Sequence, residues 1–403
     1  MGQINICLVY PGFYPDDFAG GIGTILGEYL KMFSEKKEKI ILLSRTLDLK
    51  KSIIIDKNIE IHRMPTDVNR FIKILNFITR NRFRMLFYSI SIYIYLKKIS
   101  KNKKIDIIEG CDWGAELYYT AKHRLKIPIL VRIHTPSFIS EKYNPSNKSY
   151  LGSYTKKIEK KLLNNSNIIV ITPENSIINE FKNENVMPHK IIYNACYPLS
   201  EVKLKGEKKN KYCNIMFAGR IEERKGVETI FYLMKRILLD KKIKDIKFYF
   251  FGADTTLKNG MKYRKILLKK YRLEKFVESN IFFCGFLQRE KLLEKMKEMD
   301  IYISASKYEL VGYSALESIK NGNILIHSGT GLLRKFIRNN REGFTFKNKE
   351  ELVTMVLKII DNDVNNIEQI RQCAIKRVNK YTNSNYLYNK TMTLYKNILK
   401  VDL

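Results

Sequence analysis

The stretch MDIYISASKYELVGYSALESIKNGNILIHSGTG, residues 299–331, decides the fold of this chain. Its first apolar run, residues 300–304, is typical of a buried strand, and residues 323–327 are typical of another. A loop over 305–311 separates the first strand from a helix that is expected to start at Gly312. Strand, loop, helix and strand in this order predict parallel strands in an open α/β sheet.

Two acids stand out in this stretch, Glu309 on the loop and Glu317 in the helix. Open α/β sheets bind their ligands at the carboxyl ends of parallel strands. Both acids follow such a strand end, so they are candidates for a ligand site. The alternative for Glu317 is an exposed helical acid without a functional role.

The length of 403 residues exceeds what one hydrophobic core usually supports, so two domains are expected. Alternating strand and helix patterns run through the first half and restart at Cys213. The stretch before this restart is polar, basic and without apolar periodicity, as in a linker. We expect an N-terminal domain over 1–198, a linker over 199–212, a second domain over 213–380, and a C-terminal helix over 381–403 that packs back towards the first domain.

The chain is strongly basic, with 73 Lys and Arg against 41 Asp and Glu and a formal net charge of +32. Such a charge attracts polyanions, whether nucleic acid, anionic membranes or phosphorylated small molecules. Biased codon usage is an alternative source of the charge, because Lys, Ile and Asn are abundant together. The six cysteines are scattered without a metal-binding spacing, so buried reduced thiols are expected.

The segment over 70–104, RFIKILNFITRNRFRMLFYSISIYIYLKKISKNKK, mixes basic with aromatic and aliphatic residues and contains no acid. A basic helix of this kind suits the headgroup region of an anionic membrane. The alternative is an ordinary amphipathic helix that packs on the sheet. Nucleic acid is a disfavoured partner, because no nucleic-acid-binding module accompanies the charge.

The chain is expected in the cytoplasm, or peripherally on the cytosolic face of a membrane. Its first residues, MGQINICLVY, enter a strand pattern directly and lack the features of a signal peptide. The longest apolar run, residues 85–96, falls well short of the roughly 20 residues that a spanning helix needs.

Two candidate ligand positions lie in the first half. Gly20 and Gly21 occupy a strand-to-helix turn, where backbone N–H groups and a helix N-terminus can approach an anion. Leu26 stands where a dinucleotide-binding fingerprint has glycine, so a nicotinamide site is disfavoured, and a tight turn without a ligand is the alternative. His134 follows an expected strand over 128–133 and is placed for a ligand, although a lone histidine is more often structural.

In the second half, Arg220 and Lys225 lie between the expected strand over 213–218 and the following helix. An arginine can bind phosphate oxygens bidentately, and a lysine adds a point charge. Two cations for a diphosphate and one carboxylate for a ribose would form a nucleotide site.

These motifs give the chain a resemblance to the family-4 glycosyltransferases. It rests on the Gly20-Gly21 loop, Glu-Gly-Cys-Asp-Trp-Gly at 109–114, Val-Arg-Ile-His-Thr-Pro at 131–136, Ala-Gly-Arg-Ile-Glu-Glu-Arg-Lys-Gly at 218–226 and Ser306-x-x-Glu309-x-x-Gly312-x-x-x-x-Glu317. The motifs span nearly the whole chain, and the last two in combination are specific. The resemblance implies an α/β protein with the GT-B fold, in which two Rossmann-like, doubly wound domains face each other across a cleft.

The resemblance also implies roles for individual residues. Glu317 would hold the ribose hydroxyls, Arg220 and Lys225 would neutralise the donor diphosphate, and Glu309 and His134 would face the transferred sugar. The implied catalytic residues are Glu309, His134, Arg220 and Lys225, and the implied donor-binding residues are Gly20, Gly21, Arg220, Lys225, Leu310, Val311, Gly312 and Glu317.

The activity implied by the resemblance is a retaining transfer of a hexose-type sugar from a UDP- or GDP-sugar. The acceptor would be a glycan or a lipid-linked molecule in cell-surface polysaccharide synthesis. No cofactor and no essential metal are expected, because cationic side chains and helix N-termini can stabilise the leaving diphosphate. No D-x-D motif lies where such a metal would be needed.

The chain departs from the family pattern in three places. Leu310-Val311 replace the usual Phe or Pro-Phe, Ser318-Ile319-Lys320-Asn321 stand where the family has a helix of small residues, and Arg334 stands where an acid is common. Two other classes stay open from the residues: a nucleotide-sugar epimerase or phosphorylase of similar architecture, and a non-catalytic basic protein that binds membranes or nucleic acid.

Overall fold

The computed structural model describes residues 3–12, 21–46, 52–65, 70–147, 152–194, 198–199, 213–240, 245–361 and 366–401. The chain divides into two compact units. The first comprises Met1–Ile139, Ser149–Ser200 and Thr382–Leu403, and the second comprises Ser140–Lys148 and Glu201–Tyr381. Residues 140–148 thus differ from the expected boundary, which assigned them to the first domain. Apart from Leu199, the expected linker lies outside the described residues.

The first unit is built on an eight-stranded sheet in the order β3-β4-β2-β1-β5-β6-β7-β8. All neighbouring strands are parallel except β3 and β4. The central strands are continuous apolar runs because both faces of a parallel sheet are buried. The strands are β1 (Asn5–Tyr10), β2 (Lys39–Thr46), β3 (Ser52–Asp56), β4 (Ile59–Pro65), β5 (Ile107–Cys111), β6 (Ile129–Arg132), β7 (Ile168–Thr172) and β8 (Ile191–Tyr193).

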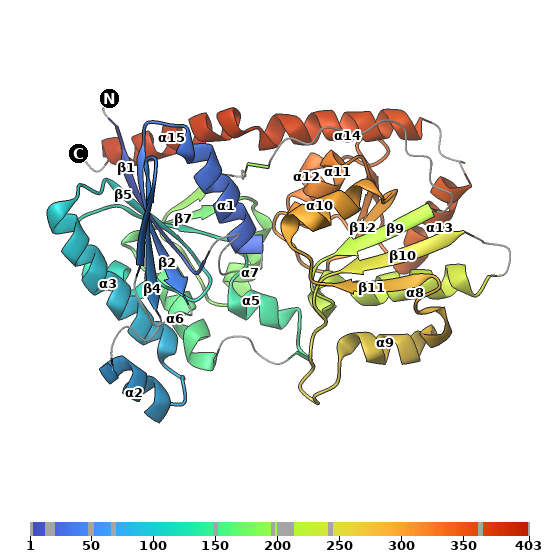
Figure 1. Cartoon of the computed structure of the whole chain (residues 1–403), viewed down its shortest axis with the longest axis horizontal. Helices are drawn as coiled ribbons and strands as arrows, with labels where there is room; N and C mark the ends of the chain where they lie inside the picture. The colour runs from blue at the N-terminus through green and yellow to red at the C-terminus, as the bar shows by residue number, and fades with distance from the viewer. Residues whose placement is uncertain are drawn as a thin grey trace. The chain divides into compact units, whose positions relative to one another are not determined.

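Helices flank this sheet, and α2 is set apart from it at the bottom of the view (Figure 1). They are α1 (Gly21–Ser34), α2 (Arg70–Ile78), α3 (Arg84–Asn102), α4 (Tyr118–His123), α5 (Ser137–Lys142), α6 (Ser153–Leu163), α7 (Ser176–Asn183) and α15 (Ser384–Val401). The single basic helix expected over 70–104 is wrong, since a turn over 79–83 separates α2 from α3. One face of α3 is buried, including Tyr88, Ile92 and Leu96. Among the described residues, no helix is long and apolar enough to cross a bilayer.

The C-terminal helix α15 lies beside α1 in the first unit (Figure 1). Its Tyr395 is fully buried and donates a hydrogen bond to Glu109 Oε2 at 2.7 Å, while its hydroxyl lies 2.9 Å from that of Tyr29. Glu109 in turn receives two hydrogen bonds from Arg132, at 2.7 and 3.0 Å. This ion pair is buried, so the tyrosine hydroxyl helps to satisfy a carboxylate that water cannot reach.

The second unit contains a six-stranded, entirely parallel sheet in the order β11-β10-β9-β12-β13-β14. Numbered from its first strand, this is the 3-2-1-4-5-6 order of a doubly wound fold. Its strands are β9 (Cys213–Ala218), β10 (Ile246–Phe251), β11 (Ile281–Gly285), β12 (Ile301–Ser304), β13 (Ile324–His327) and β14 (Phe344–Thr345).

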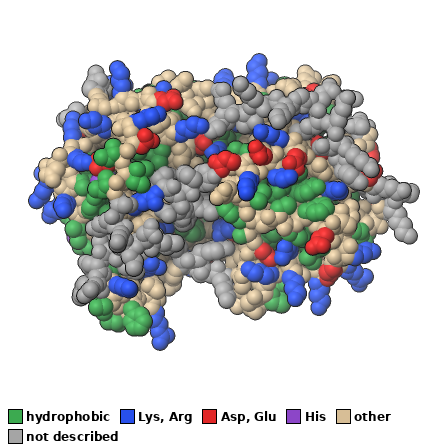
Figure 2. Space-filling view, in the orientation of Figure 1, with side chains coloured by type: hydrophobic (Ala, Val, Ile, Leu, Met, Phe, Trp, Pro, Cys, Tyr) green, Lys and Arg blue, Asp and Glu red, His purple; other side chains and the backbone are tan. Residues whose placement is uncertain are grey.

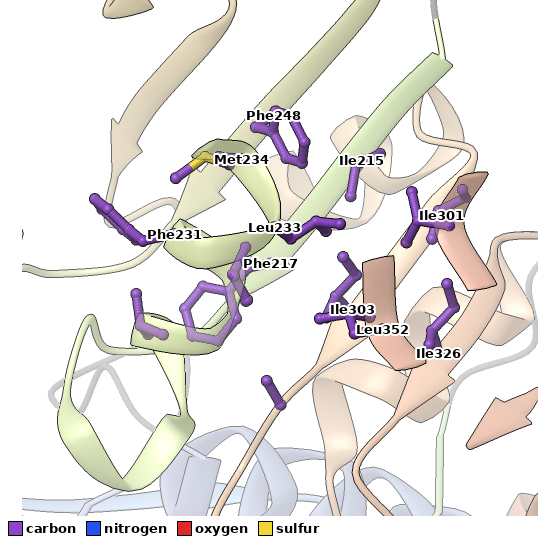
Figure 3. Packing of buried hydrophobic residues seen from close by; sticks show 14 of the residues in the cluster. Ile215, Phe217, Phe231, Leu233, Met234, Phe248, Ile301, Ile303, Ile326 and Leu352 are labelled. Carbon is purple, nitrogen blue, oxygen red and sulfur yellow. The ribbon is translucent and has the colours of Figure 1, made fainter. Parts of the chain in front are cut away.

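The second unit has two 3-10 helices, η1 (Glu223–Lys225) and η2 (Glu274–Phe276). Its α-helices are α8 (Val227–Leu238), α9 (Tyr263–Tyr271), α10 (Arg289–Lys297), α11 (Tyr313–Lys320), α12 (Leu333–Phe336), α13 (Lys349–Ile360) and α14 (Ile367–Thr382). Figure 3 shows Phe231 and Met234 of α8 and Leu352 of α13 packed with strand residues such as Phe217 and Ile303. The stretch 299–331 therefore lies in the middle of this core, and the expected two-domain α/β fold is confirmed.

Candidate active site

The carboxyl ends of β9 and β12 form the centre of the candidate site in the second unit. These two strands are neighbours at the point where the strand order reverses, which is where doubly wound sheets bind ligands. Gly226, with φ of 63°, lies against the loop that follows β12, and a Cβ atom there would come within 1.7 Å of the Ala305 carbonyl oxygen. Only glycine allows this approach, which brings the chain after β9 onto the chain after β12.

Arg224 connects the loop after β9 to the loop after β12 through buried hydrogen bonds. Its side chain is buried, donates to Glu222 Oε1 at 2.8 Å and to the Tyr308 carbonyl at 3.1 Å, and its own carbonyl accepts from Lys307 N at 2.8 Å. Arg220 lies beside the same Glu222, with 3.4 Å between Nε and Oε2, and its side chain is 37% exposed. Arg220 is therefore the more accessible of the two guanidinium groups.

Lys225 and Glu309, which are 84 positions apart in the sequence, form an ion pair in the space between the loops. Arg224 Nη1 lies 3.9 Å from the same carboxylate oxygen. Burial alone would raise the pKa of Glu309, but the positive charges of Lys225 and Arg224 outweigh it and hold that pKa below its usual range. Glu309 is therefore ionised at neutral pH.

The Ser-Gly-Thr-Gly loop after β13 supports the Glu309 loop. Gly331 has φ of 58°, and a Cβ there would meet the Glu309 carbonyl oxygen at 2.0 Å, while Leu332 N donates to the Leu310 carbonyl at 2.8 Å. The side chains of Leu310 and Val311 are buried, so this stretch can offer only its backbone to a ligand. Leu310 and Val311 thus differ from their family counterparts at positions that pack inward.

The N-terminus of α11 is held at the same sheet edge. Gly312 precedes it with φ of 78°. The hydroxyl of Ser314, in the first turn, donates to the Ala218 carbonyl at 3.1 Å and lies 2.7 Å from that of Tyr302, which donates to the same carbonyl at 3.0 Å. The backbone N–H groups of a helix start are thereby fixed beside the end of β9, and such groups attract anions.

Glu317 lies one turn further along α11 and is buried. Its Oε1 accepts a hydrogen bond of 2.9 Å from Arg289 Nε, and Arg289 is the first residue of α10. Glu317 is therefore not an exposed helical acid. Of the other departures from the family pattern, residues 318–321 are buried, and Arg334 lies on α12 with an exposed side chain.

The remaining predicted residues belong to the first unit. Gly21 is the first residue of α1, exposed and with open space where a Cβ would lie, whereas Gly20 lies outside the described residues. His134 follows β6, its backbone N–H donates to Asp112 Oδ1 at 2.9 Å, and its ring meets that of Tyr10 edge-on at 6.1 Å. Burial, helped by the charge of Arg132, lowers the pKa of His134 to about 3, so the imidazole is neutral at physiological pH.

Buried acids hold the loops around His134. Glu159 of α6 accepts from the backbone N–H groups of Gly114 and Ser137, at 2.9 and 3.0 Å. Burial raises the pKa of Glu159 to about 8 and that of Asp112 to about 7. In the described ranges, no group of three or more His, Cys, Asp and Glu side chains is arranged to hold a metal ion.

Two family models match the chain. The model described as "Glycosyltransferase Family 4" matches residues 19–196, and that of "Glycosyl transferases group 1" matches residues 200–377. Together they account for both units except the ends of the chain and a short junction. The chain belongs to the family-4 glycosyltransferases. An uncharacterized glycosyltransferase of Methanocaldococcus jannaschii is 25% identical over 418 residues, which cover 99% of either chain.

Solved structures agree with the fold of this glycosyltransferase. A sucrose-phosphate synthase from Thermosynechococcus elongatus has a TM-score of 0.75 and 16% identity, covering 99% of this chain and 100% of that one. Anabaena HepE, solved in complex with UDP-glucose, has a TM-score of 0.66 and 13% identity, covering 98% and 100%. At these identities the likeness shows the GT-B fold alone.

Sequence reasoning missed several residues that shape the glycosyltransferase site. Arg289 could have been suspected, because helix N-termini favour anions and a cation in the first turn indicates a tertiary partner. No local signal marks Tyr302 and Ser314 as joint supports of the Ala218 carbonyl, because their partnership depends on which strands are neighbours. No local signal marks Asp112 either, because its carboxylate accepts a hydrogen bond from the backbone N–H of His134, and every residue except proline has such a group.

Proposed function

We propose that this glycosyltransferase moves a hexose-type sugar, with retention, from a UDP- or GDP-sugar to a glycan or lipid-linked acceptor in cell-surface polysaccharide synthesis. The observation that carries the proposal is the meeting of Arg220, the Lys225–Glu309 pair and the N-terminus of α11 at the switch point of the second sheet. This arrangement supplies positive charge on one side and a carboxylate directly beside it.

The cations would bind the donor diphosphate. Transfer of the sugar leaves an additional negative charge on the β-phosphate, and Arg220, Lys225 and the N–H groups of α11 would stabilise that charge. Because these groups are held by buried partners before the donor arrives, little reorganisation would accompany the reaction. Side-chain cations would in this way take the part that a divalent metal has in other transferases.

Glu309 and Glu317 would bind the two sugars of the donor. An ionised carboxylate accepts hydrogen bonds only, so it suits the hydroxyl groups of a sugar. Glu309, kept ionised by Lys225, would accept from the transferred hexose, and Glu317, oriented by Arg289, would accept from the ribose. His134 would face the transferred sugar as a neutral imidazole. The HepE structure with UDP-glucose supports a donor of this class.

We also propose that the protein docks peripherally on anionic membranes, where a lipid-linked acceptor would be found. The support comes from α2, whose side chains of Ile74, Phe77 and Ile78 are 56%, 83% and 68% exposed. Figure 2 shows hydrophobic side chains gathered at α2 with Lys and Arg beside them. An apolar surface with flanking cations suits the headgroup region of an anionic bilayer.

Calorimetric titration with UDP and with GDP tests the donor proposal. Wild-type protein should bind one of them, and Arg220→Ala should weaken that binding by a factor of about 100, as expected for loss of a charged phosphate contact. Arg236→Ala removes the same charge from the exposed last turn of α8 and should bind like wild type. Absence of binding to either nucleotide by the wild type, or equal binding by Arg220→Ala, would contradict the proposal.

A further inference from the structure

A short segment from the first half of the sequence is built into the second unit. Residues 140–148, the clamp segment, begin with the last three residues of α5, a helix that starts three positions after His134. Its Asn144 is buried, and Asn144 Oδ1 accepts a hydrogen bond of 2.8 Å from the backbone N–H of Arg224. Asn144 Nδ2 donates to the Ser140 carbonyl at 2.9 Å, which fixes the orientation of the amide.

Further contacts of the clamp segment fall on the same two loops. Ser146 N donates to Glu223 Oε2 at 3.2 Å, so the segment holds a second residue of η1. The ring of Tyr143 stacks on that of Tyr308 with centroids 5.0 Å apart and an angle of 19° between the planes. The residues that it holds, Arg224 and Tyr308, immediately precede Lys225 and Glu309.

We propose that the clamp segment positions the donor-binding loops of the second unit, with Asn144 as the positioning residue for Lys225; the proposal rests on the donor site described above. The backbone N–H of Arg224 is a buried donor, and Asn144 supplies its acceptor. Fixing this N–H sets the path of η1 and hence the direction from which Lys225 reaches Glu309. Tyr143 sets the other loop by stacking on the residue before Glu309.

Nucleotide affinity tests the proposal in the full-length protein. Asn144→Ala should raise the Kd for UDP or GDP, whichever the wild type binds, and lower kcat/KM for the matching nucleotide sugar, each about tenfold. Asn144→Asp keeps an acceptor oxygen for the Arg224 N–H but loses the donation to the Ser140 carbonyl, so its loss should be smaller than that of Asn144→Ala. Ser146→Ala is the matched control, since Ser146 acts through its backbone N–H. Wild-type affinity in Asn144→Ala, or equal losses in the alanine and aspartate variants, would overturn the proposal.

Hydrogen exchange provides a readout that needs no ligand. In Asn144→Ala, the backbone amides of peptides covering 220–226 should exchange at least tenfold faster than in wild type. The thermal unfolding midpoint of the variant should stay close to that of the wild type. Tyr143→Ala, which removes the stacking on Tyr308, should accelerate exchange over 305–311 in the same way. Unchanged exchange in both variants would overturn the clamp. If the wild type binds neither nucleotide, the donor proposal fails, and the exchange rates still decide whether the segment holds the loops.

Discussion

Glu317 and Arg289 are the residues at which the structure changes the interpretation of the sequence most. Glu317 is buried and receives a hydrogen bond from a cation on another helix. A carboxylate oriented in this way is preorganised, because its partner has fixed the rotamer before a ligand arrives. The acid and its cation should therefore act as one functional group.

We expect Glu317→Ala to lower kcat/KM for the nucleotide sugar about 100-fold, the range for a lost hydrogen bond to a charged group. Arg289→Ala should lower it about tenfold, because Glu317 loses its orientation but stays present. The double variant should be no worse than Glu317→Ala, since Arg289 acts through the acid. Steady-state kinetics of the three variants measure this coupling. Losses that multiply would show that Arg289 contacts the donor independently.

Three buried acids of the first unit predict a pH dependence of stability. Burial raises the pKa of Glu159 to about 8, and that of Glu116 and Asp112 to about 7. In the unfolded chain these groups ionise near pH 4, so between pH 4 and 8 the native state binds more protons than the unfolded state. Their stabilising contribution is complete below pH 4 and is lost as the pH rises through 7 to 8.

Urea unfolding at pH 7.5 and pH 9 measures this effect for Glu159, in a range that lies above the pKa of about 6.5 that histidine has in an unfolded chain. The free energy of unfolding of the wild type should fall between the two pH values, and Glu159→Gln should fall less. Glu35→Gln, at an exposed position of the first unit, should follow the wild type. A wild-type stability that rises over this range would contradict the assignment of Glu159 as a neutral buried acid.

At the scale of elements, α2 and α3 differ in which side chains they bury, although both come from one basic stretch of the sequence. The buried face of α3 packs in the first unit, as Tyr88, Ile92 and Leu96 show. On α2 the side chains of Ile74, Phe77 and Ile78 are exposed instead, that of Phe77 most of all. Periodicity alone could not separate the two helices, because basic and apolar residues alternate in both.

We expect α2 to carry the membrane affinity. Phe77→Ser combined with Ile78→Ser should reduce flotation with anionic vesicles at least fivefold at low salt, because about 2 kcal/mol or more of apolar burial is lost. Ile94→Ser, which removes an exposed side chain of α3, is the control and should float like wild type. Flotation should also weaken at high salt. Equal flotation of all three proteins would exclude α2 as the docking element.

At the scale of the whole molecule, the chain returns to its first unit after completing the second. Helix α15 contributes Leu387, Met392, Tyr395 and Ile398 to the core that contains β1 and α1. The first unit is therefore complete only when the last residues of the chain have been added. The first unit is thus discontinuous in sequence.

Truncation after Tyr381 should lower the thermal midpoint of the first unit by more than 10 °C, because it removes these buried side chains. Tyr395→Phe should cost about 1–2 kcal/mol, since Glu109 loses a buried hydrogen-bond donor. Tyr386→Phe, at an exposed position of the same helix, serves as the control. Calorimetry and urea unfolding measure both effects. A truncated chain with an unchanged midpoint would show that α15 is dispensable for the first unit.

Much of this molecule followed from local patterns in the sequence. Apolar runs of strand length between helical segments predicted two α/β domains, and Gly226, Gly312 and Gly331 occupy turns where a backbone with positive φ is required. These patterns are readable because strand and helix periodicity involve neighbouring residues only. The motifs at 218–226 and 306–317 carried the resemblance to the family, and both lie at strand ends.

The contacts between distant residues depended on the three-dimensional arrangement. Lys225 meets Glu309 because β9 and β12 are neighbours in the sheet, and that order follows from how the crossover helices pack. Asn144 reaches Arg224 within the second unit, and Tyr395 reaches Glu109 within the first, although each pair is far apart in the sequence and no periodicity connects its members. Periodic patterns specify which elements form, whereas ion pairs and buried hydrogen bonds depend on which elements become neighbours, and packing of the cores decides that.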